Sequence, residues 1–360
     1  MSRFHFAIFS LICLFSCQSH HEKSQEDRVS EEQNICKYSK WLRIAEKPEG
    51  TLVEIIDPQS KESSVFSVGE GFKTDLVLAQ GSPLGVFSTT HIGMLSEINA
   101  LEKIKATTDA KLVYNEWVQN NIASGRIKSF SENQLPDLEE LVQSGIKILI
   151  HSGFQGEHPA KAKLKKFGIE TIPNYEWMES HPLGKAEWIL FFGVLTGQEE
   201  LAKKSFTYIE RQYNALSQNV SFKDTQILMG NMMGDYWVAP NESSFNARFI
   251  QDAGGRYIFS KEEVIGDGSL LLPFEQVVHS SKESYFWINP GMSTKDRLLE
   301  SNPKLAFLEP FQKGKIYCYS HNANRYWELG PIQPHLILSD FIQMLSPGNN
   351  GSLNFYKEVN

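Results

Sequence analysis

The sequence is built around one long amphipathic segment with a similar pattern of short strands and helices on either side of it. Apolar residues recur along this segment at spacings of three and four: Leu201 or Ala202, Phe206, Ile209, Tyr213 and Leu216. This spacing predicts one face of a helix of about 18 residues. A second apolar segment, AEWILFFGVL at residues 186–195, precedes it and stops near Gly197.

Short apolar runs alternate with helical segments on both sides of this helix. Strands are predicted on the N-terminal side at LGVFS (84–88), KLVY (111–114), IKILI (146–150) and IETIP (169–173), with helices at 136–144 and 160–167. Strands are predicted on the C-terminal side at TQILMG (225–230), YFWIN (285–289) and KIYCYS (315–320), with a closing helix at 340–345. Such alternation is typical of parallel sheets in α/β proteins.

The expected fold is therefore α/β, with two lobes of mainly parallel sheet, a long helix that bridges them, and a ligand cleft between them. A chain of this length suits two lobes better than one core. The predicted divisions are 37–180 for the N-terminal lobe with a leading β-meander, 181–219 for the interlobe helices, 220–347 for the C-terminal lobe and 348–360 for a tail. Because a helix bends less than a loop, only a small closure is expected on ligand binding.

The first residues predict export. Arg3 precedes an apolar run over residues 4–15, which is too short to span a membrane. Residues 14–17, Leu-Phe-Ser-Cys, resemble the lipobox of bacterial lipoproteins, so residues 1–17 are predicted to be a lipoprotein signal peptide with Cys17 as the lipidated residue. A cleaved signal without a lipid is the alternative. Residues 18–36 are polar and predict a disordered tether, which places the protein in the cell envelope, anchored and facing the periplasm.

Composition and motifs exclude several classes of function. The net charge is −8 and there is no long basic run, so nucleic acid is not an expected partner. No GxSxG, GxxxxGK[ST], HExxH or helix-opening GxGxxG motif is present, so neither an enzyme nor a bound cofactor is predicted. Cys36 and Cys318 have no zinc-type spacing, and a disulfide between them and two separate thiols are both compatible with the sequence.

Candidate ligand-binding residues follow the predicted strands, because ligands of open α/β sheets lie beyond the carboxyl ends of the strands. Aromatic faces suit a large, conjugated ligand, and an arginine suits carboxylate, phosphate or catecholate oxygens. The candidates are His91, Tyr114, Trp117, Phe154, Tyr236, Trp237, Asn289, Arg325 and Trp327.

Two alternative functions are also compatible with the sequence. His91 with His151 and His158 could bind Zn²⁺ or Mn²⁺, if these side chains converge. A secreted α/β hydrolase is the third hypothesis, and it requires a nucleophile beside a histidine in the cleft.

Several segments resemble the substrate-binding proteins of iron-siderophore, haem and cobalamin ABC importers, over about residues 84–347. FSTTHIGML resembles the opening strand, loop and helix of the first lobe, and LPDLEELVQSGIKILI a segment that usually ends in PDLV or PDVI, with Ile146-Lys147 here in place of Pro-Asp. WVAPNESSFNARFIQDAGGRYIF resembles the opening of the second lobe, with Asn241 where glycine is usual, and LPFEQVV and IQPHLILSDFIQMLSP resemble later segments.

The resemblance implies a function and partners. The ligand would be a ferric chelate (a siderophore complex or haem) or cobalamin, with iron complexes ranked first, and the partner an ABC permease dimer. In this family a glutamate on each lobe docks onto permease arginines. Glu139 and Glu275 match these positions, with Glu140 as the substitute for Glu139. Judged by charge alone, these would be ordinary solvated carboxylates.

Overall fold

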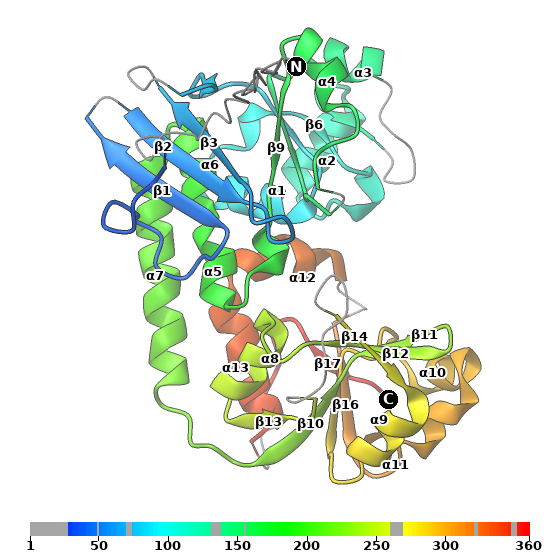
Figure 1. Ribbon diagram of the computed structural model, residues 1–360. Helices are drawn as coiled ribbons and strands as arrows, with labels where there is room; N and C mark the ends of the chain where they lie inside the picture. The colour runs from blue at the N-terminus through cyan, green and yellow to red at the C-terminus, as the bar shows by residue number, and fades with distance from the viewer. Residues whose placement is uncertain are drawn as a thin grey trace, which may run out of the picture.

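The computed structural model describes residues 28–48, 50–69, 74–130, 138–154, 156–259, 269–319, 323–346 and 351–360. Two α/β lobes lie one above the other and are joined along one side by the long helix α7, Glu199–Ser217 (Figure 1). The predicted signal peptide, with Cys17, and the tether as far as residue 27 lie outside the described residues. Within the described part of the chain, no helix has the length and hydropathy of a membrane span.

The N-terminal lobe contains a five-stranded parallel sheet in the order β7-β6-β5-β8-β9. The strands are β5 (Leu84–Val86), β6 (Ile104–Thr107), β7 (Lys128–Ser129), β8 (Ile148–His151) and β9 (Glu170–Pro173). The helices are α1 (Thr89–Glu97), α2 (Glu116–Ala123), α3 (Leu138–Gln143) and α4 (Lys161–Lys166), with 3-10 turns η2 (Leu101–Lys103), η3 (Ala110–Leu112) and η4 (Glu176–Met178). The strand predicted at KLVY is wrong, because η3 covers the first two of its four residues and the strand of this region is β6.

Residues of the N-terminal lobe before β5 form a separate four-stranded sheet. Its strands β1 (Leu42–Lys47), β2 (Gly50–Ile56) and β3 (Ser63–Val68) pair antiparallel, and β4 (Val77–Leu78) adds a parallel edge. Residues 28–36 pack onto this sheet: Val29 is buried against Ala45 and Leu52. The prediction of a disordered tether as far as residue 36 is therefore wrong for its last residues.

The interlobe region matches the sequence pattern closely. Helix α5 (Pro182–Glu187) is followed by α6 (Ile189–Thr196), all of whose residues are buried. Gly197 ends α6 with φ of 76°, a left-handed conformation that glycine adopts without a Cβ penalty. Helix α7 buries the predicted face, including Ala202, Phe206 and Ile209, and leaves its polar face to solvent.

The C-terminal lobe has a second sheet in the order β13-β10-β15-β16-β17, parallel except for β17. Its strands are β10 (Thr225–Met229), β13 (Gly255–Tyr257), β15 (Phe286–Ile288), β16 (Lys315–Cys318) and β17 (Lys357–Glu358). A small antiparallel sheet, β11 (Asn231–Met233), β12 (Tyr236–Pro240) and β14 (Ser269–Pro273), was not predicted. The helices are α8 (Phe245–Asp252), α9 (Phe274–Ser280), α10 (Lys295–Ser301), α11 (Glu309–Gln312), α12 (Ala323–Leu329) and α13 (Pro334–Met344), with η5 (Pro303–Phe307) and η7 (Gly330–Ile332).

The chain end belongs to this lobe, so the predicted tail is wrong over residues 351–360. Strand β17 extends the main sheet, and Phe355 and Tyr356 are buried. The buried carboxylate of Asp340 fixes the segment by accepting bonds from the backbone N–H groups of Asn354 (2.7 Å) and Phe355 (2.7 Å).

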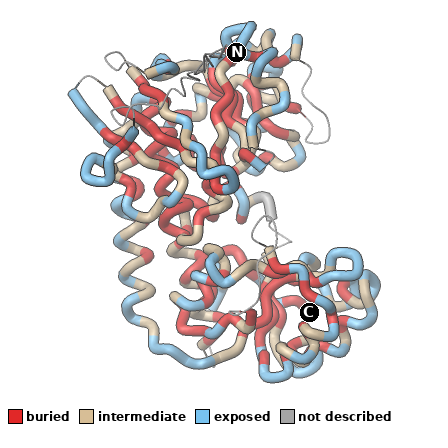
Figure 2. Tube along the Cα trace, viewed as in Figure 1, coloured by how far each residue is buried: buried red, intermediate tan, exposed pale blue. Residues whose placement is uncertain are grey.

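A second contact ties the lobes together beside α7. Helix α12 packs on α1, and a Cβ at Gly93 would lie 1.8 Å from the carbonyl oxygen of Glu328. The Glu328 carboxylate also accepts bonds from the backbone N–H groups of Tyr114 (2.9 Å) and Asn115 (3.0 Å). Each lobe keeps its own buried sheet (Figure 2), and this contact adds to the stiffness of the bridge.

A candidate binding cleft between the lobes

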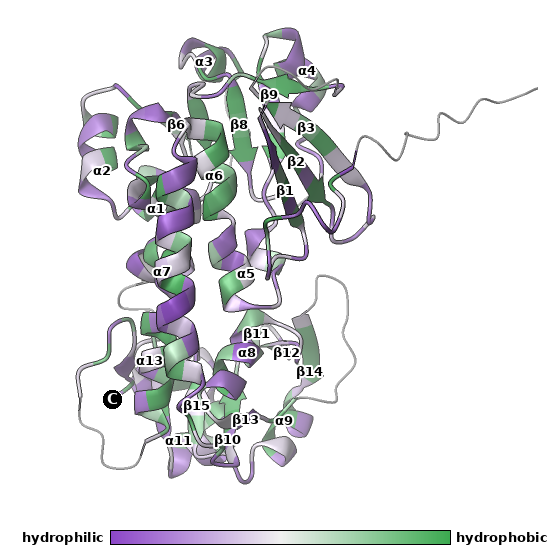
Figure 3. Ribbon diagram, turned by 90° about the vertical axis from the view of Figure 1, so that its left-hand side faces the viewer, coloured by the Kyte–Doolittle hydropathy of each residue, from purple (hydrophilic) through white to green (hydrophobic). Residues whose placement is uncertain are grey.

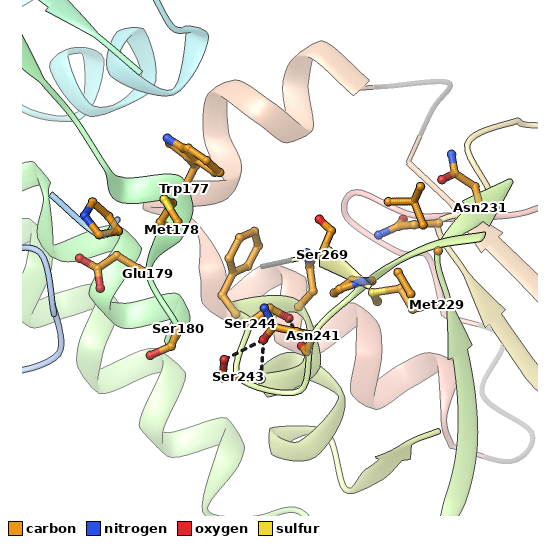
Figure 4. Close-up of a pocket in the computed structure, with 18 of the residues that line it drawn as sticks. Trp177, Met178, Glu179, Ser180, Met229, Asn231, Asn241, Ser243, Ser244 and Ser269 are labelled. Atoms are coloured by element: carbon orange, nitrogen blue, oxygen red, sulfur yellow. Dashed lines mark hydrogen bonds between the residues drawn. The ribbon is translucent and has the colours of Figure 1, made fainter. Parts of the chain in front are cut away.

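A cleft of about 1190 Å³ lies between the lobes and is bordered by the ends of several strands. Figure 4 shows η4 residues on one side of it and the β11–β12 and α8 segments on the other. The first lobe and its meander contribute Lys40, Trp41, Pro58, Gln59, Trp177, Met178, Glu179 and Ser180. The second lobe contributes Met229, Gly230, Asn231, Val238, Ala239, Pro240, Asn241, Ser243, Ser244, Phe245, Asn246, Ser269, Asn289, Gly291, Cys318 and Tyr319.

The lining combines aromatic faces with uncharged hydrogen-bonding groups. Trp41, Trp177 and Phe245 supply flat apolar surface, while asparagine amides and serine hydroxyls supply donors and acceptors. Among the described lining residues, Lys40 is the only one with a cationic side chain, and none is an arginine. Lys40 is an exposed residue. The cleft therefore suits a large ligand with little net charge.

Two buried glutamates position the wall that contains Lys40 and Trp41. The Glu187 carboxylate accepts bonds from the backbone N–H groups of Lys37 (2.6 Å), Tyr38 (2.8 Å) and Ser39 (2.7 Å). The Glu179 carboxylate accepts bonds from the N–H of Lys40 (2.9 Å), the N–H of Trp41 (3.4 Å) and the indole of Trp188 (3.0 Å). We call Glu179 and Glu187 the carboxylate clamp.

Burial determines the charge state of this clamp. Desolvation raises the pKa of Glu187 to about 7, against the lowering effect of its three N–H bonds, and the nearby Glu179 carboxylate raises it further. Burial also raises the pKa of Glu179. Glu179 thus lines the cleft, but its carboxylate already accepts hydrogen bonds from the backbone of Lys40 and Trp41 and from the indole of Trp188.

The floor in the second lobe is set by local capping. Ser244 caps α8, where its hydroxyl accepts a bond from the N–H of Ala247 (3.2 Å), and Asn241 accepts one from the N–H of Ser243 (2.8 Å). Asn289 follows β15 with φ of 60°, a left-handed conformation that asparagine tolerates better than most residues. These turns place short polar side chains at the carboxyl ends of β12 and β15.

Tyr319 lines the cleft as a packed ring. It stacks on Tyr326 with ring centroids 4.0 Å apart and an interplanar angle of 4°. Burial raises the pKa of its phenol well above the ordinary range, so the phenol stays protonated at neutral pH. No histidine is among the described lining residues. The described lining therefore offers no imidazole to a metal.

Four of the predicted ligand residues lie in or beside the cleft. Asn289 lines it. Phe154 is exposed at the rim, with its ring 5.5 Å from that of Trp177, and Trp327 borders a small cavity next to Phe245. Tyr236 is exposed on the small sheet, whose outward residues continue the cleft floor.

The predictions for Trp237 and His91 are wrong. Trp237 has no exposed surface, because it points to the inner face of β12, where its ring lies 5.4 Å from that of Trp287 and its indole donates to the carbonyl of Met229 (3.1 Å). His91 is on the buried face of α1, with its ring 5.3 Å from that of Phe192.

Tyr114, Trp117 and Arg325 do not line the cleft either. Tyr114 precedes α2, where its backbone bonds to Glu328, and Trp117 is exposed on α2 itself. The guanidinium carbon of Arg325 lies 5.7 Å from the ring centroid of Phe355, so this cation packs against the chain end. The expected arginine for an anionic ligand is therefore engaged elsewhere.

The alternative chemistries lack their geometry. The rings of His151 and His158 lie 5.2 Å apart and His91 is close to them, but no three His, Cys, Asp or Glu side chains in the described part of the chain converge as a metal site. Burial lowers the pKa of His91 and of His151 to about 3, so both are neutral. The hydrolase hypothesis has no histidine in the described lining to act as a base. Cys36 and Cys318 are separate, buried thiols.

The predicted docking glutamates lie on different lobes. Glu139 is in the first turn of α3 and Glu275 in the first turn of α9, and these helices belong to different lobes (Figure 1). Both residues are exposed. Glu140 is 3.8 Å from the ammonium of Lys128. Exposure on separate lobes is necessary for two-point docking, and the role itself stays a prediction.

Some lining residues had a signal in the sequence and others had none. Trp177 follows the predicted strand at residues 169–173, and Asn241, Ser243 and Ser244 lie in the WVAPNESS motif, so both segments could have been chosen. Trp41 comes from the start of the meander, and only the tertiary fold brings it to the cleft.

Comparison with known proteins places the fold. No protein-family model matches the chain. An uncharacterized lipoprotein of Methanocaldococcus jannaschii is 23% identical over 272 residues, which is 73% of this chain and 64% of that protein. This chain therefore spans less than two thirds of the length of that relative.

Solved structures give the same architecture at low sequence identity. The periplasmic haem-binding protein of Vibrio cholerae has a TM-score of 0.56 and 17% identity, over 71% of this chain and 97% of that one. A periplasmic binding protein of Veillonella parvula has a TM-score of 0.57 and 11% identity, over 82% and 98%. The vitamin B12-binding protein of Vibrio cholerae has a TM-score of 0.51 and 11% identity, over 74% and 98%. The chain thus has the two-lobed fold of periplasmic binding proteins, and the predicted fold class is confirmed.

Proposed function

We propose that this chain, which has the fold of periplasmic binding proteins, is an envelope lipoprotein that captures a metal chelate and delivers it to an ABC importer. The observation that carries the proposal is the interlobe cleft of about 1190 Å³. This volume exceeds the roughly 300–1,000 Å³ of ordinary small-molecule pockets, so a ligand larger than a common metabolite fits it.

The charge of the cleft favours an electroneutral chelate. Haem carries two carboxylates and catecholate iron complexes are anionic, and a buried anion requires a cationic partner. The described lining offers only the exposed Lys40 in that role. Its amides and hydroxyls instead match the amide-rich surface of a corrinoid or the peptide backbone of a neutral hydroxamate siderophore. The sequence alone ranked iron complexes above cobalamin. The lining of the cleft instead favours cobalamin over any iron complex that is anionic.

The metal would arrive and leave inside its chelator. The ring of Tyr319 is stacked on that of Tyr326, and the described lining contains no histidine, so binding would rest on the shape and polarity of the chelate. Two of the similar structures are described as binding proteins for haem and for vitamin B12, and both of these ligands are metal chelates.

Delivery would use the exposed carboxylates of Glu139 and Glu275, one on each lobe. Helix α7 and the α1–α12 contact hold the lobes at a fixed separation, so the two carboxylates form a two-point gauge for arginines on a permease. Carboxylate–arginine pairs provide geometric specificity. A lipid on Cys17 would keep the protein at the membrane that contains this permease.

Isothermal titration of the purified mature protein tests the proposal. The probes are cyanocobalamin and ferrichrome, which are electroneutral, haemin and ferric enterobactin, which are anionic, and Zn²⁺ alone. We expect one electroneutral probe to bind at a ratio of one to one and to lose affinity in Trp177→Ala, with no tight binding of Zn²⁺. Stoichiometric binding of Zn²⁺ alone, or of haemin in preference to both neutral probes, would contradict the proposal.

A further inference from the structure

The small antiparallel sheet in the second lobe exposes an unusual amount of apolar surface on one face. Met233 is 71% exposed, Tyr236 55% and Leu271 44%. Strand β14 is hydrophobic along most of its length (Figure 3). Apolar residues scattered singly on a surface need no explanation, but a contiguous set marks an interaction site.

The strand pairing places these side chains on a single face. Met233 pairs with Tyr236, and Tyr236 pairs with Pro273. Val238 pairs with Leu271, and directly paired or alternate residues of antiparallel strands share one face. The outward face of the sheet therefore carries Met233, Tyr236, Val238, Leu271 and Pro273, which we call the shelf.

The shelf is continuous with the floor of the cleft. Val238 and its cross-strand partner Asn231 line the cleft, as do Pro240 and Ser269 farther along the same face. The opposite face holds Trp237 and Leu272, which are buried in the lobe. The floor thus extends without a break from polar side chains at Asn231 and Ser269 to apolar ones at Met233 and Tyr236.

We propose that the shelf is a second ligand subsite, which takes an apolar ring or arm of the same chelate that the cleft binds. This inference rests on the proposed function and specifies its ligand as bipartite, with a polar metal-chelating part in the cleft and an apolar part on the shelf. The cleft floor and the shelf are parts of one sheet face and meet at Val238. A chelate that extends beyond the cleft at this point would therefore contact the shelf.

Hydroxyl-radical footprinting of the mature protein tests the placement. The probe is cyanocobalamin or ferrichrome, whichever binds in the titration, together with the same metal centre in a smaller chelator (dicyanocobinamide or ferric acetohydroxamate). Methionine and tyrosine oxidise readily, so Met233 and Tyr236 report directly on the shelf. We expect the larger probe to lower their oxidation severalfold, the smaller probe to leave it unchanged, and the exposed Phe222 and Tyr285 to show no protection from either.

Variants provide the energetic test. Met233→Ser with Leu271→Ser should weaken the larger probe about tenfold, the scale of a lost interface contact, and leave the smaller probe unaffected. Phe222→Ser, an equally exposed apolar residue of the same lobe, is the matched control. Equal loss for both probes, or none for either, overturns the shelf while cleft binding still stands. If oxidation of Met233 and Tyr236 falls with rising protein concentration in the absence of any probe, the shelf is an interface with a second copy of the chain. That result also overturns the ligand subsite.

Discussion

Glu187 of the carboxylate clamp sets a pH dependence of stability whose size follows from its burial. Its pKa rises from the ordinary 4.5 to about 7 in the folded chain, mainly through desolvation. A raised pKa means that the folded state binds the proton more tightly than the unfolded state. The resulting stability is present below about pH 4.5 and is lost as pH rises to about 7. At 1.36 kcal/mol for each unit, the difference amounts to about 3 kcal/mol.

Glu187→Gln isolates this effect because glutamine cannot ionise. Its amide also replaces an acceptor with a donor near the N–H groups of Lys37 to Ser39, and that penalty is the same at every pH. The free energy of unfolding of the variant minus that of the wild type should therefore increase by about 3 kcal/mol between pH 4.5 and pH 8. Urea unfolding followed by tryptophan fluorescence at several pH values measures it.

A control and a competing outcome make the reasoning refutable. Glu200→Gln removes a carboxylate whose side chain is 91% exposed on α7, so it is the matched control in which no buried carboxylate is lost. A Glu187→Gln difference that stays flat, or that falls with rising pH, would show that the three N–H bonds outweigh desolvation. The stated account of the clamp would then be wrong.

Four further predictions concern the cleft, the core, docking and the anchor. Trp177→Ala should weaken binding of the neutral probe by about 1–3 kcal/mol in titration with little change in melting temperature, and an unaltered affinity would remove Trp177 from the site. Trp237→Ala should lower the free energy of unfolding by about 3–5 kcal/mol, because Trp237 is fully buried, and a mild effect in urea unfolding would argue against its core position. Glu139→Ala and Glu275→Ala should each reduce uptake of the chelate by cells while affinity in titration is unchanged, with the double variant worse, and normal uptake by the double variant would end the docking proposal. Cys17→Ser should abolish incorporation of labelled palmitate, and equal labelling of variant and wild type would exclude Cys17 as the lipid site.

The sequence was informative where its pattern is long or repeated. The spacing from Leu201 to Leu216 predicted α7, and the alternation of apolar runs and helices predicted the parallel sheets, because burial on both faces leaves continuous apolar runs. Two features decided by distant contacts were missed. The chain end joins the sheet because Asp340 fixes Asn354 and Phe355, and residues 28–36 pack on the meander.

The candidate site was harder to predict because each side chain depends on register. On β12 the sequence offers Tyr236 and Trp237 together, and a period of two sends one outward and the other into the core. His91 follows the strand predicted at residues 84–88, but the residues around it form α1 and bury its ring. Trp41 reaches the cleft only because the clamp holds residues 37–41 against the interlobe helices, a contact that spans more than a hundred residues of sequence.

Native mass spectrometry of the protein purified from its own cell envelope tests the central claim most directly. Val238 lies on the outward face of β12 and lines the cleft, so Val238→Trp should place a bulky ring where the ligand binds without disturbing the core. We predict that the wild type retains one non-covalent ligand with the isotope pattern of a metal chelate, and that Val238→Trp lacks it. A wild type that carries no ligand in any preparation and binds none of the probes, or a ligand retained equally by both proteins, would contradict capture in the interlobe cleft.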